Sequence, residues 1–303
     1  MKQVITVIGP TASGKTSVCV KLSVSKSIEV ISADSRQIYK YMDIGTGKPT
    51  PEEKEKVAHH LIDIIDPDEK YSAAKFGRDC KEKVKEINSR GNIPIICGGT
   101  VLYIKAILEG LFLEPHIPEE IREEVRNQVE EKGPEIMHVE LSKVDPKSGE
   151  RIHPNDRQRI ARALEIFRAS GIPLSEHLRK GNKNILPLNM YCLLPERNFL
   201  HKNIEKRIKE MFRCGFVDEV KNLLSMGYNP SLYSFTSIGY REIAKFLLNR
   251  KNGNINEIEG EITKKTKEYS SRQITFIKGL KGVQFYKTKD TLREGLLEEL
   301  KTS

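Results

Sequence analysis

The sequence predicts an α/β fold: a parallel sheet flanked by helices and interrupted by a mostly helical insertion domain. Over the first third of the 303 residues, short apolar runs alternate with charged amphipathic stretches, which is typical of a parallel sheet covered by helices. Near Glu114 this pattern changes, because Pro115 and Pro118 interrupt the chain and charged helical stretches follow. A strand-like run returns at 188–194. We therefore expect a core formed by 1–113 and 186–303, with the insertion domain at 114–185.

The elements of the first part follow from the spacing of apolar residues. Short apolar runs predict strands at 3–8, 28–32, 61–65 and 93–97. Apolar residues at helical spacing predict helices at 16–26 and 73–89, and Gly91 is expected to end the second of these. Strands that alternate with helices in this way favour parallel pairing, because each connection must cross the sheet.

Helical patterns dominate the rest of the chain. In the insertion we expect helices at 119–132 and 156–169, with Asn155 or Asp156 as the N-cap of the second. After the returning strand, further helices are expected at 204–224, 241–248 and 257–277.

Composition excludes several classes of protein. Hydrophobic residues make up 38% of the chain and charged residues 31%, which allows a buried core and argues against disorder. No long uncharged apolar run occurs, so we expect no membrane span. The five cysteines are odd in number, which favours reduced thiols in a cytoplasmic protein. The net charge of +9 fits a polyanionic partner and a basic enzyme about equally well. The cysteines are far apart without a C-x-x-C pair, so we expect reduced thiols and no zinc site.

The most specific motif is a glycine-rich loop. It consists of Gly9, Pro10, Thr11, Ala12, Ser13, Gly14, Lys15 and Thr16. The loop fits G-x-x-x-x-G-K-[ST] at every fixed position, between a predicted strand and a predicted helix. Its backbone N–H groups and Lys15 suit phosphate oxygens, and the Thr16 hydroxyl can ligate Mg²⁺. The motif predicts a P-loop NTPase-like core that binds a di- or triphosphate. It does not distinguish phosphoryl transfer from the departure of a whole diphosphate.

Two further candidates follow predicted strands, at the edge where open parallel sheets bind ligands. Asp34 could hold Mg²⁺ or accept a proton from an attacking amine or hydroxyl, or it could simply cap a turn. The run Gly98-Gly99-Thr100 indicates close approach to a ligand or a plain strand-to-helix turn. Asp66, at the end of LIDIID, is a weaker candidate metal ligand.

Taken together, the motifs resemble those of a known family. They are GPTASGKT (9–16), ISADSRQIYKYMDIGTGKP (31–49), YSAAKF (71–76), GGTVLY (98–103), IHPNDRQRIARALE (152–165), SIGYRE (237–242) and SRQITFIK (271–278). In this order they resemble the bacterial tRNA dimethylallyltransferases, from residue 3 to about 285. The resemblance implies transfer of a dimethylallyl group from dimethylallyl diphosphate to N6 of adenosine 37, in the anticodon stem-loop of tRNA. It also implies Mg²⁺ as cofactor, and we expect a monomer.

The resemblance further implies roles for single residues. Asp34 matches the general base, Thr100 matches a threonine near the reacting adenine, and the glycine-rich loop would hold the donor diphosphate. The stretches that match tRNA contacts contain Ser35, Arg36, Gln37, Gln158, Arg159, Ile160, Ala161, Arg162, Thr236, Ser237, Ile238, Gly239, Tyr240, Arg241, Ser271, Arg272, Gln273, Ile274, Thr275, Phe276, Ile277 and Lys278. Arg122 is an additional candidate on basic character alone. Departures from the family pattern are few: Phe276 and Lys278 replace a common Trp and Arg, and Gly47 replaces a common Ala.

Three other functions share some of these features. A small-metabolite kinase would use the same loop, but it does not need the two arginine-bearing helical segments. An isopentenyltransferase acting on free adenine nucleotide should need less basic surface. A non-catalytic RNA-binding switch would need a hydrolysis motif, for which LIDIID is poor support. The arginines of 157–168 could also be a solvated helix face paired to Glu165.

Overall fold

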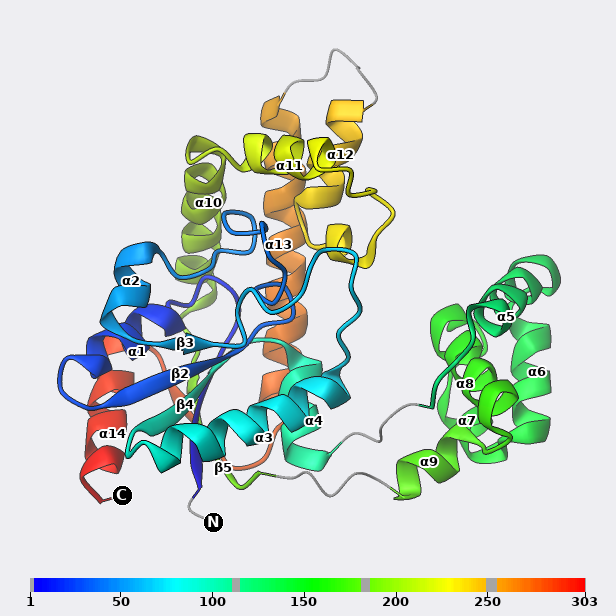
Figure 1. The fold of residues 1–303 in the computed structure, drawn as a ribbon, viewed down its shortest axis with the longest axis horizontal. Coiled ribbons are helices and arrows are strands. Elements are labelled where there is room, and N and C mark those ends of the chain that lie inside the picture. The colour runs from blue at the N-terminus through cyan, green and yellow to red at the C-terminus, as the bar shows by residue number, and fades with distance from the viewer. Residues whose placement is uncertain (1–2, 111–114, 181–185, 249–254, 303) are drawn as a thin grey trace. The chain divides into compact units, whose positions relative to one another are not determined.

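The computed structural model describes residues 3–110, 115–180, 186–248 and 255–302. Contacts divide the chain into two compact units (Figure 1). One unit combines Met1–Leu108 with Leu186–Ser303, and the other is Glu109–Ile185. The sequence-based boundaries at 113/114 and 185/186 fall beside or within 111–114 and 181–185, which lie outside the described residues.

The first unit is built on a parallel sheet, which within the described residues has six strands in the order β3-β2-β4-β1-β5-β6. The strands are β1 (Val4–Ile8), β2 (Ile28–Ala33), β3 (His59–His60), β4 (Ile93–Gly98), β5 (Leu188–Leu193) and β6 (Val283–Tyr286). Gly98 pairs with both Ile8 and Ala33, so β1, β2 and β4 end at one level. The predictions at 3–8, 28–32, 93–97 and 188–194 are confirmed, whereas β6 is an addition.

The strand predicted at 61–65 is wrong. The strand β3 ends at His60, and Leu61 and Asp63 then adopt positive φ angles of 59° and 58°. Such left-handed residues cannot continue an extended strand. Leu61 and Ile65 are nevertheless buried, so the apolar run reflects a buried loop. The N–H of Ile64 donates to the carbonyl of Ile38 at 2.9 Å, so this loop braces the segment that follows β2.

Helices before and after the insertion complete the first unit. They are α1 (Lys15–Ser23), α2 (Pro51–Lys56), α3 (Ala73–Ser89), α4 (Val101–Glu109), α10 (Arg197–Arg213), α11 (Phe216–Ser225), α12 (Tyr240–Leu248), α13 (Ile255–Lys278) and α14 (Lys289–Thr302). The single helix predicted at 204–224 is wrong, because Gly215 adopts a left-handed φ of 97° and separates α10 from α11. The sequence analysis did not predict α2, α4 or α14.

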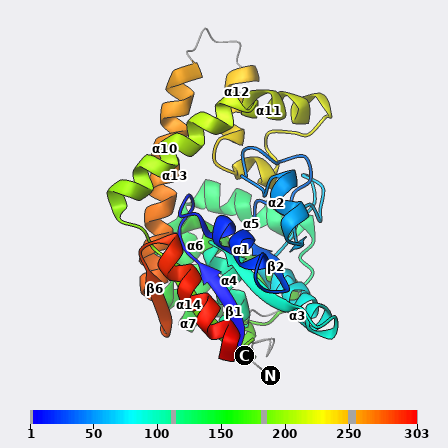
Figure 2. The same ribbon diagram turned by 90° about the vertical axis from the view of Figure 1, so that its left-hand side faces the viewer.

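Helices cover both faces of the sheet. On one face, α14 lies beside α1, and apolar side chains of both pack with strand residues such as Val7 and Val30 (Figures 1 and 2). On the other face, α3 packs against β2 and β4. Its buried residues include Phe76, Cys80, Val84 and Ile87, as helical spacing predicted. Gly91 follows the end of α3 with a φ of 76°, which confirms the predicted stop.

A second apolar core lies among α10, α11, α12 and α13, beyond the sheet (Figure 1). It encloses Ile38, Tyr39 and Met42 from the segment after β2, together with Phe216 of α11 and Tyr240 of α12. This burial explains how a long connection after β2 can hold a defined path, because apolar side chains anchor it among four helices.

In the described residues of the second unit, the regular secondary structure consists of helices joined by short loops. Its helices are α5 (Glu119–Lys132), α6 (Pro134–Val144), α7 (Pro146–Arg151), α8 (Arg157–Ser170) and α9 (Leu174–Lys180). Val125, Met137, Leu141 and Leu164 lie in its core. Of the two predicted caps of α8, Asp156 is the one used, since its Oδ1 accepts the N–H of Arg159 at 3.1 Å. In the described part of the chain, no helix is long and apolar enough to cross a membrane.

Candidate active site

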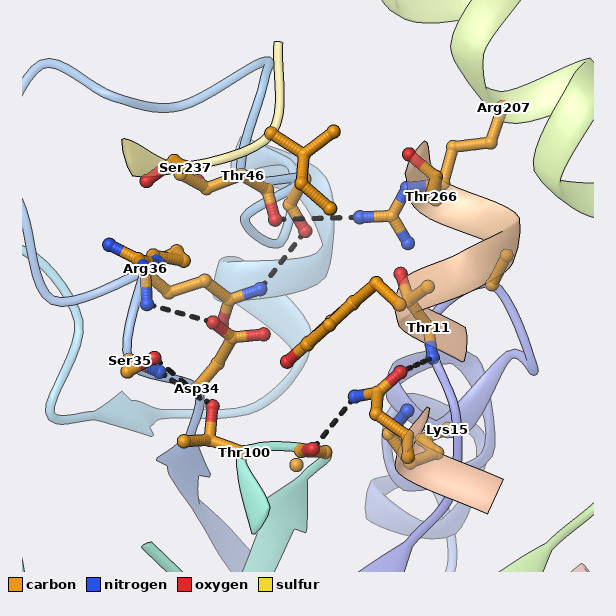
Figure 3. A pocket seen from close by; sticks show the side chains of 18 of the residues that line it. Thr11, Lys15, Asp34, Ser35, Arg36, Thr46, Thr100, Arg207, Ser237 and Thr266 are labelled. Atoms are coloured by element: carbon orange, nitrogen blue, oxygen red, sulfur yellow. Dashed lines mark hydrogen bonds between the residues drawn. The ribbon is translucent and has the colours of Figure 1, made fainter. Parts of the chain in front are cut away.

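A cavity of about 700 Å³ opens at the carboxyl ends of β1, β2 and β4 (Figure 3). The glycine-rich loop, residues 34–37 and residues 98–102 line one part of it, and side chains of α10 and α13 line another. The first three segments are those that the sequence analysis expected at one edge of the sheet. The structure brings them together around one space large enough for a small ligand and a nucleobase.

The glycine-rich loop has the geometry of a phosphate cradle. Gly14 adopts a left-handed φ of 98° directly before α1, so the N-terminus of that helix faces the cavity side of the loop. A Cβ added to Gly9 would lie 2.5 Å from the carbonyl oxygen of Leu193, so only glycine fits there. The Lys15 ammonium donates to the carbonyls of Gly9 and Pro10 at 2.9 and 2.8 Å. Burial lowers the pKa of Lys15, and the nearby Asp34 carboxylate opposes that shift.

A magnesium ion in this cavity would be bound through oxygen atoms. Thr16 lines the cavity next to Lys15. Among the described residues, no cluster of three or more His, Cys, Asp or Glu side chains is arranged to hold a metal ion. The Thr16 hydroxyl beside the phosphate cradle is an oxygen donor of the kind that Mg²⁺ prefers, and this ion usually keeps several waters and binds ligand phosphate oxygens.

Asp34 both caps a turn and lines the cavity. Its Oδ1 accepts the N–H of Arg36 at 2.9 Å, which forms an Asx turn. The turn uses one carboxylate oxygen and leaves the second for a ligand. Thr100 ties this segment to the end of β4, since its hydroxyl accepts the N–H of Ser35 at 2.9 Å. The two polar features after β2 and β4 are thus joined directly.

The two residues that follow Ser35 have different surroundings. The Arg36 guanidinium lies 4.9 Å from the centroid of the Tyr233 ring, and its Nη1 donates to the Tyr233 carbonyl at 3.3 Å. Gln37 is half-buried and held by two hydrogen bonds: its Oε1 accepts the hydroxyl of Ser32 at 2.8 Å, and its Nε2 donates to the carbonyl of Gly47 at 3.1 Å. Both residues line the cavity.

Arg207 of α10 is a cavity residue that the sequence analysis missed. It faces Asp34 across the cavity (Figure 3), and its Nη2 donates to the carbonyl of Thr46 at 3.4 Å. A Cβ added to Gly47 would lie only 1.8 Å from this nitrogen, so glycine leaves room for the guanidinium. Burial lowers the pKa of Arg207, whereas Asp34 opposes the shift. A signal was available, because position 207 follows the buried Ile204 by three residues and shares its helix face.

Gln273 of α13, one of the candidate tRNA-contacting residues, lines the cavity and links two of its loops. Its side chain is buried, its Oε1 accepts the N–H of Thr11 at 2.9 Å, and its Nε2 donates to the carbonyl of Gly99 at 2.7 Å. One amide therefore links the glycine-rich loop to the loop after β4. Ile277 is buried as well, whereas Arg272, Thr275 and Lys278 are exposed at intervals of three residues along α13. Arg272 also lines the cavity. The remaining residues of this stretch, Ser271, Ile274 and Phe276, are half-buried.

The candidate residues from 236 to 241, which lead into α12, also differ in exposure. Thr236, Ser237 and Ile238 line the cavity, and Arg241 is exposed. Gly239 and Tyr240 are buried. The Tyr240 hydroxyl donates to Glu219 at 2.6 Å. Tyr240 therefore belongs to the framework around the cavity.

In the second unit, the candidate RNA-contacting residues divide by exposure. Gln158 and Arg159 are exposed on α8, whereas Ile160 and Ala161 are buried in the core of the unit. Arg162 is half-buried and donates to Glu165 at 2.9 Å, which is the pairing that the sequence left open. Arg122 lies 3.4 Å from Glu119. Arg168 has a structural role, since it forms ion pairs with Glu124 of α5 and Glu140 of α6.

Comparison with known proteins identifies the family. A family model described as IPP transferase matches residues 37–280. The tRNA dimethylallyltransferase of Caldanaerobacter subterraneus subsp. tengcongensis is 39% identical over 310 aligned positions, which cover 98% of this chain and 97% of that protein. The crystal structure of a tRNA isopentenylpyrophosphate transferase from Bacillus halodurans aligns with a TM-score of 0.71 at 34% identity, covering 100% of this chain and 98% of that one.

A eukaryotic dimethylallyltransferase solved while acting on tRNA gives a TM-score of 0.75 at 26% identity, over 95% of this chain and 74% of the other. The family model spans residues of both units, and the two bacterial relatives align with 98% and 100% of this chain. On this evidence, the chain belongs to the IPP transferase family.

Proposed function

We propose that this protein transfers the dimethylallyl group of dimethylallyl diphosphate to N6 of adenosine 37 in tRNA. One observation carries the proposal: a single cavity is lined by a phosphate-binding loop and, across from Arg207, by the carboxylate of Asp34. A donor diphosphate and an acceptor amine need these two kinds of group within one space. Membership of the IPP transferase family supports the same reaction.

The reaction breaks the C–O bond to the diphosphate and forms a bond from the same carbon to N6 of adenine. The diphosphate leaves with the electron pair, so negative charge grows on its oxygens. Lys15, Arg207 and the start of α1 line this cavity, and their positive charge and N–H groups would stabilise the departing diphosphate. Magnesium held by Thr16 would add further charge neutralisation at the same oxygens.

In the proposal, Asp34 accepts the proton that N6 loses. The amine is a weak nucleophile because its lone pair is delocalised into the ring, so a positioned base is worth about 10²–10⁴-fold in rate. The hydrogen bond from the Arg36 N–H holds one oxygen of Asp34, which orients the other. Thr100 supports this orientation through Ser35. Both contacts fix the base before the acceptor arrives.

Exposed basic residues of both units would grip the tRNA backbone. In the first unit these are Arg241, Arg272 and Lys278, and in the second unit the residue is Arg159, whose side chain is 74% exposed. Phosphate contacts of this kind bind RNA with strong salt dependence and help to offset the few kcal/mol needed to extrude a base. The buried residues Ile160, Ala161, Tyr240, Gln273 and Ile277 would act by shaping the framework.

The direct test is mass spectrometry of tRNA nucleosides after incubation of the protein with dimethylallyl diphosphate, tRNA and Mg²⁺. We expect dimethylallyl-adenosine among the nucleosides, and mass spectrometry of ribonuclease fragments of the same tRNA should locate it at position 37 only. Modification of free adenine nucleotide in place of tRNA would identify the free-nucleotide transferase. Consumption of ATP with an acceptor, without use of dimethylallyl diphosphate, would identify a kinase.

A further inference from the structure

The loop at 43–48, here called the wall loop, forms one side of the cavity through Gly45, Thr46 and Gly47. Its backbone contacts two residues that lie near Asp34. The carbonyl of Thr46 accepts from Arg207 at 3.4 Å, and the carbonyl of Gly47 accepts from Gln37 at 3.1 Å. The position of the wall loop therefore sets where both of these side chains lie.

Glu219, in the first turn of α11, holds the beginning of the wall loop. Its Oε2 accepts the N–H groups of Asp43 and Ile44 at 2.9 and 2.7 Å. Its Oε1 accepts the N–H of Gly45 at 3.1 Å and the hydroxyl of Tyr240 at 2.6 Å. Three consecutive backbone donors thus converge on one carboxylate, and hydrogen bonds to a charged acceptor are the strong ones.

Packing and an ion pair also hold the wall loop around this contact. A Cβ added to Gly45 would lie 2.0 Å from the ring of Phe216, so the backbone presses directly on that side chain. At the far end of the loop, the buried Lys48 ammonium donates to the carbonyl of Tyr39 and to Asp43 Oδ1, both at 2.6 Å. Burial and the Glu219 carboxylate raise the pKa of Tyr240, which keeps its hydroxyl a donor.

We propose that Glu219 is a positioning residue for the transfer reaction: it fixes the wall loop, and through the loop it fixes Arg207 and Gln37 beside the glycine-rich loop and Asp34. The inference rests on the proposed function for its catalytic consequence. Glu219 is not among the residues that line the cavity in the described structure, so it acts through others. Glutamine cannot replace it, because its NH₂ group would face N–H donors that need an acceptor.

The test compares Glu219→Gln with Asp218→Asn. The control removes the same charge from the same first turn of α11 at an exposed site, so both variants weaken the helix dipole interaction equally. In Glu219→Gln we expect faster hydrogen exchange of a peptide covering 43–48 and a fall in kcat of about 10- to 100-fold, as small misplacements of reacting groups produce. The Kd for tRNA should not change. Asp218→Asn should match the wild type in exchange and in kcat.

A third variant, Tyr240→Phe, removes one of the four donors and leaves the backbone contacts in place. Its kcat should lie between those of the wild type and Glu219→Gln. Unchanged exchange of the wall loop in Glu219→Gln would overturn the inference, and so would faster exchange with an unchanged kcat. If the wild type transfers no dimethylallyl group to tRNA, the proposed function fails, and the exchange comparison alone still decides whether Glu219 holds the loop.

Discussion

The side-chain amide of Gln273 donates a hydrogen bond of 2.7 Å to the carbonyl of Gly99. Its oxygen accepts the N–H of Thr11 at 2.9 Å, so a residue of α13 joins two loops that lie far from it in sequence. A Cβ on Gly99 would lie 2.5 Å from the Gln273 Nε2 and 2.7 Å from the carbonyl oxygen of Gly9, which shows how closely the three segments pack. The distance between the phosphate cradle and Thr100 therefore depends on this amide.

Replacing Gln273 with Leu should weaken both stability and catalysis. The variant leaves a buried carbonyl and a loop N–H without their partner, at a cost of about 1–3 kcal/mol for each. We expect a lower free energy of unfolding in urea and a lower kcat with saturating substrates. Gln284→Leu, at an exposed position on β6, is the control and should change neither. Wild-type stability in Gln273→Leu would show that the bridge contributes nothing.

Two substitutions of Asp34 separate its structural role in the turn from its proposed catalytic role as the base. Asp34→Asn keeps an oxygen that can accept the Arg36 N–H, so the turn should survive, whereas Asp34→Ala loses it. Both variants lack the base, and kcat should fall by about 10²–10⁴-fold in each, with tRNA binding unchanged. Only Asp34→Ala should also lose about 1 kcal/mol of stability. Near-normal transfer by Asp34→Asn, measured by nucleoside mass spectrometry, would show that Asp34 is not the base.

Arg207 should act on the leaving diphosphate. Replacing it with Gln removes a cation that faces both Lys15 and Asp34, so we expect a higher KM for dimethylallyl diphosphate and a kcat lower by about 10²-fold. Arg213→Gln, on the same helix but exposed and paired with Glu210, is the matched control. Steady-state kinetics at fixed tRNA compare the two. If Arg207→Gln and Arg213→Gln have the same kcat and KM, Arg207 does not contribute to the reaction.

Some parts of the site could be predicted from the sequence, and others could not. The glycine-rich loop and the residues after β2 and β4 were predicted together, because parallel strands that end at one level bring their following loops together. Arg207, Glu219 and Gln273 depend on tertiary contacts. Most of their partners lie more than a hundred residues away. Helical spacing places Arg207 on the buried face of α10, but no local pattern indicates what any of these three side chains contacts.

The same dependence on tertiary contacts explains the two wrong predictions of secondary structure, the strand at 61–65 and the single helix at 204–224. The run at 61–65 is as apolar as a strand, but its burial comes from packing against the segment after β2, and two left-handed residues interrupt it. The break between α10 and α11 depends on one glycine within a continuous helical pattern. Helical spacing indicates which face is buried, yet it does not show where the chain turns.

Salt dependence should report the contact of α8 with RNA. Arg159→Ala removes a mostly exposed guanidinium, so the slope of log Kd against log salt should become shallower by about 0.7–0.9, the amount expected for one phosphate contact. Arg162 is less suitable for this test, because its side chain donates to the buried Glu165 and its removal would also disturb that contact. An unchanged slope in Arg159→Ala, from binding titrations across a salt series, would place tRNA elsewhere than on this end of α8.

Acid should reduce stability through Glu29. Burial alone would raise the pKa of this carboxyl, but hydrogen bonds from Arg90, Asn92 and His60 outweigh it and lower the pKa from 4.5 to about 2. A group whose pKa is lower in the folded state stabilises the protein above its unfolded pKa, and that stabilisation is lost as pH falls through the folded pKa. The wild type should therefore gain on the order of 3 kcal/mol of unfolding free energy relative to Glu29→Gln as pH rises from about 2 to well above 4.5. The difference should shrink between pH 4.5 and about 2 in urea titrations. A difference that stays constant over this range would mean that the carboxyl titrates alike in both states, despite its four hydrogen bonds of 2.5–3.2 Å.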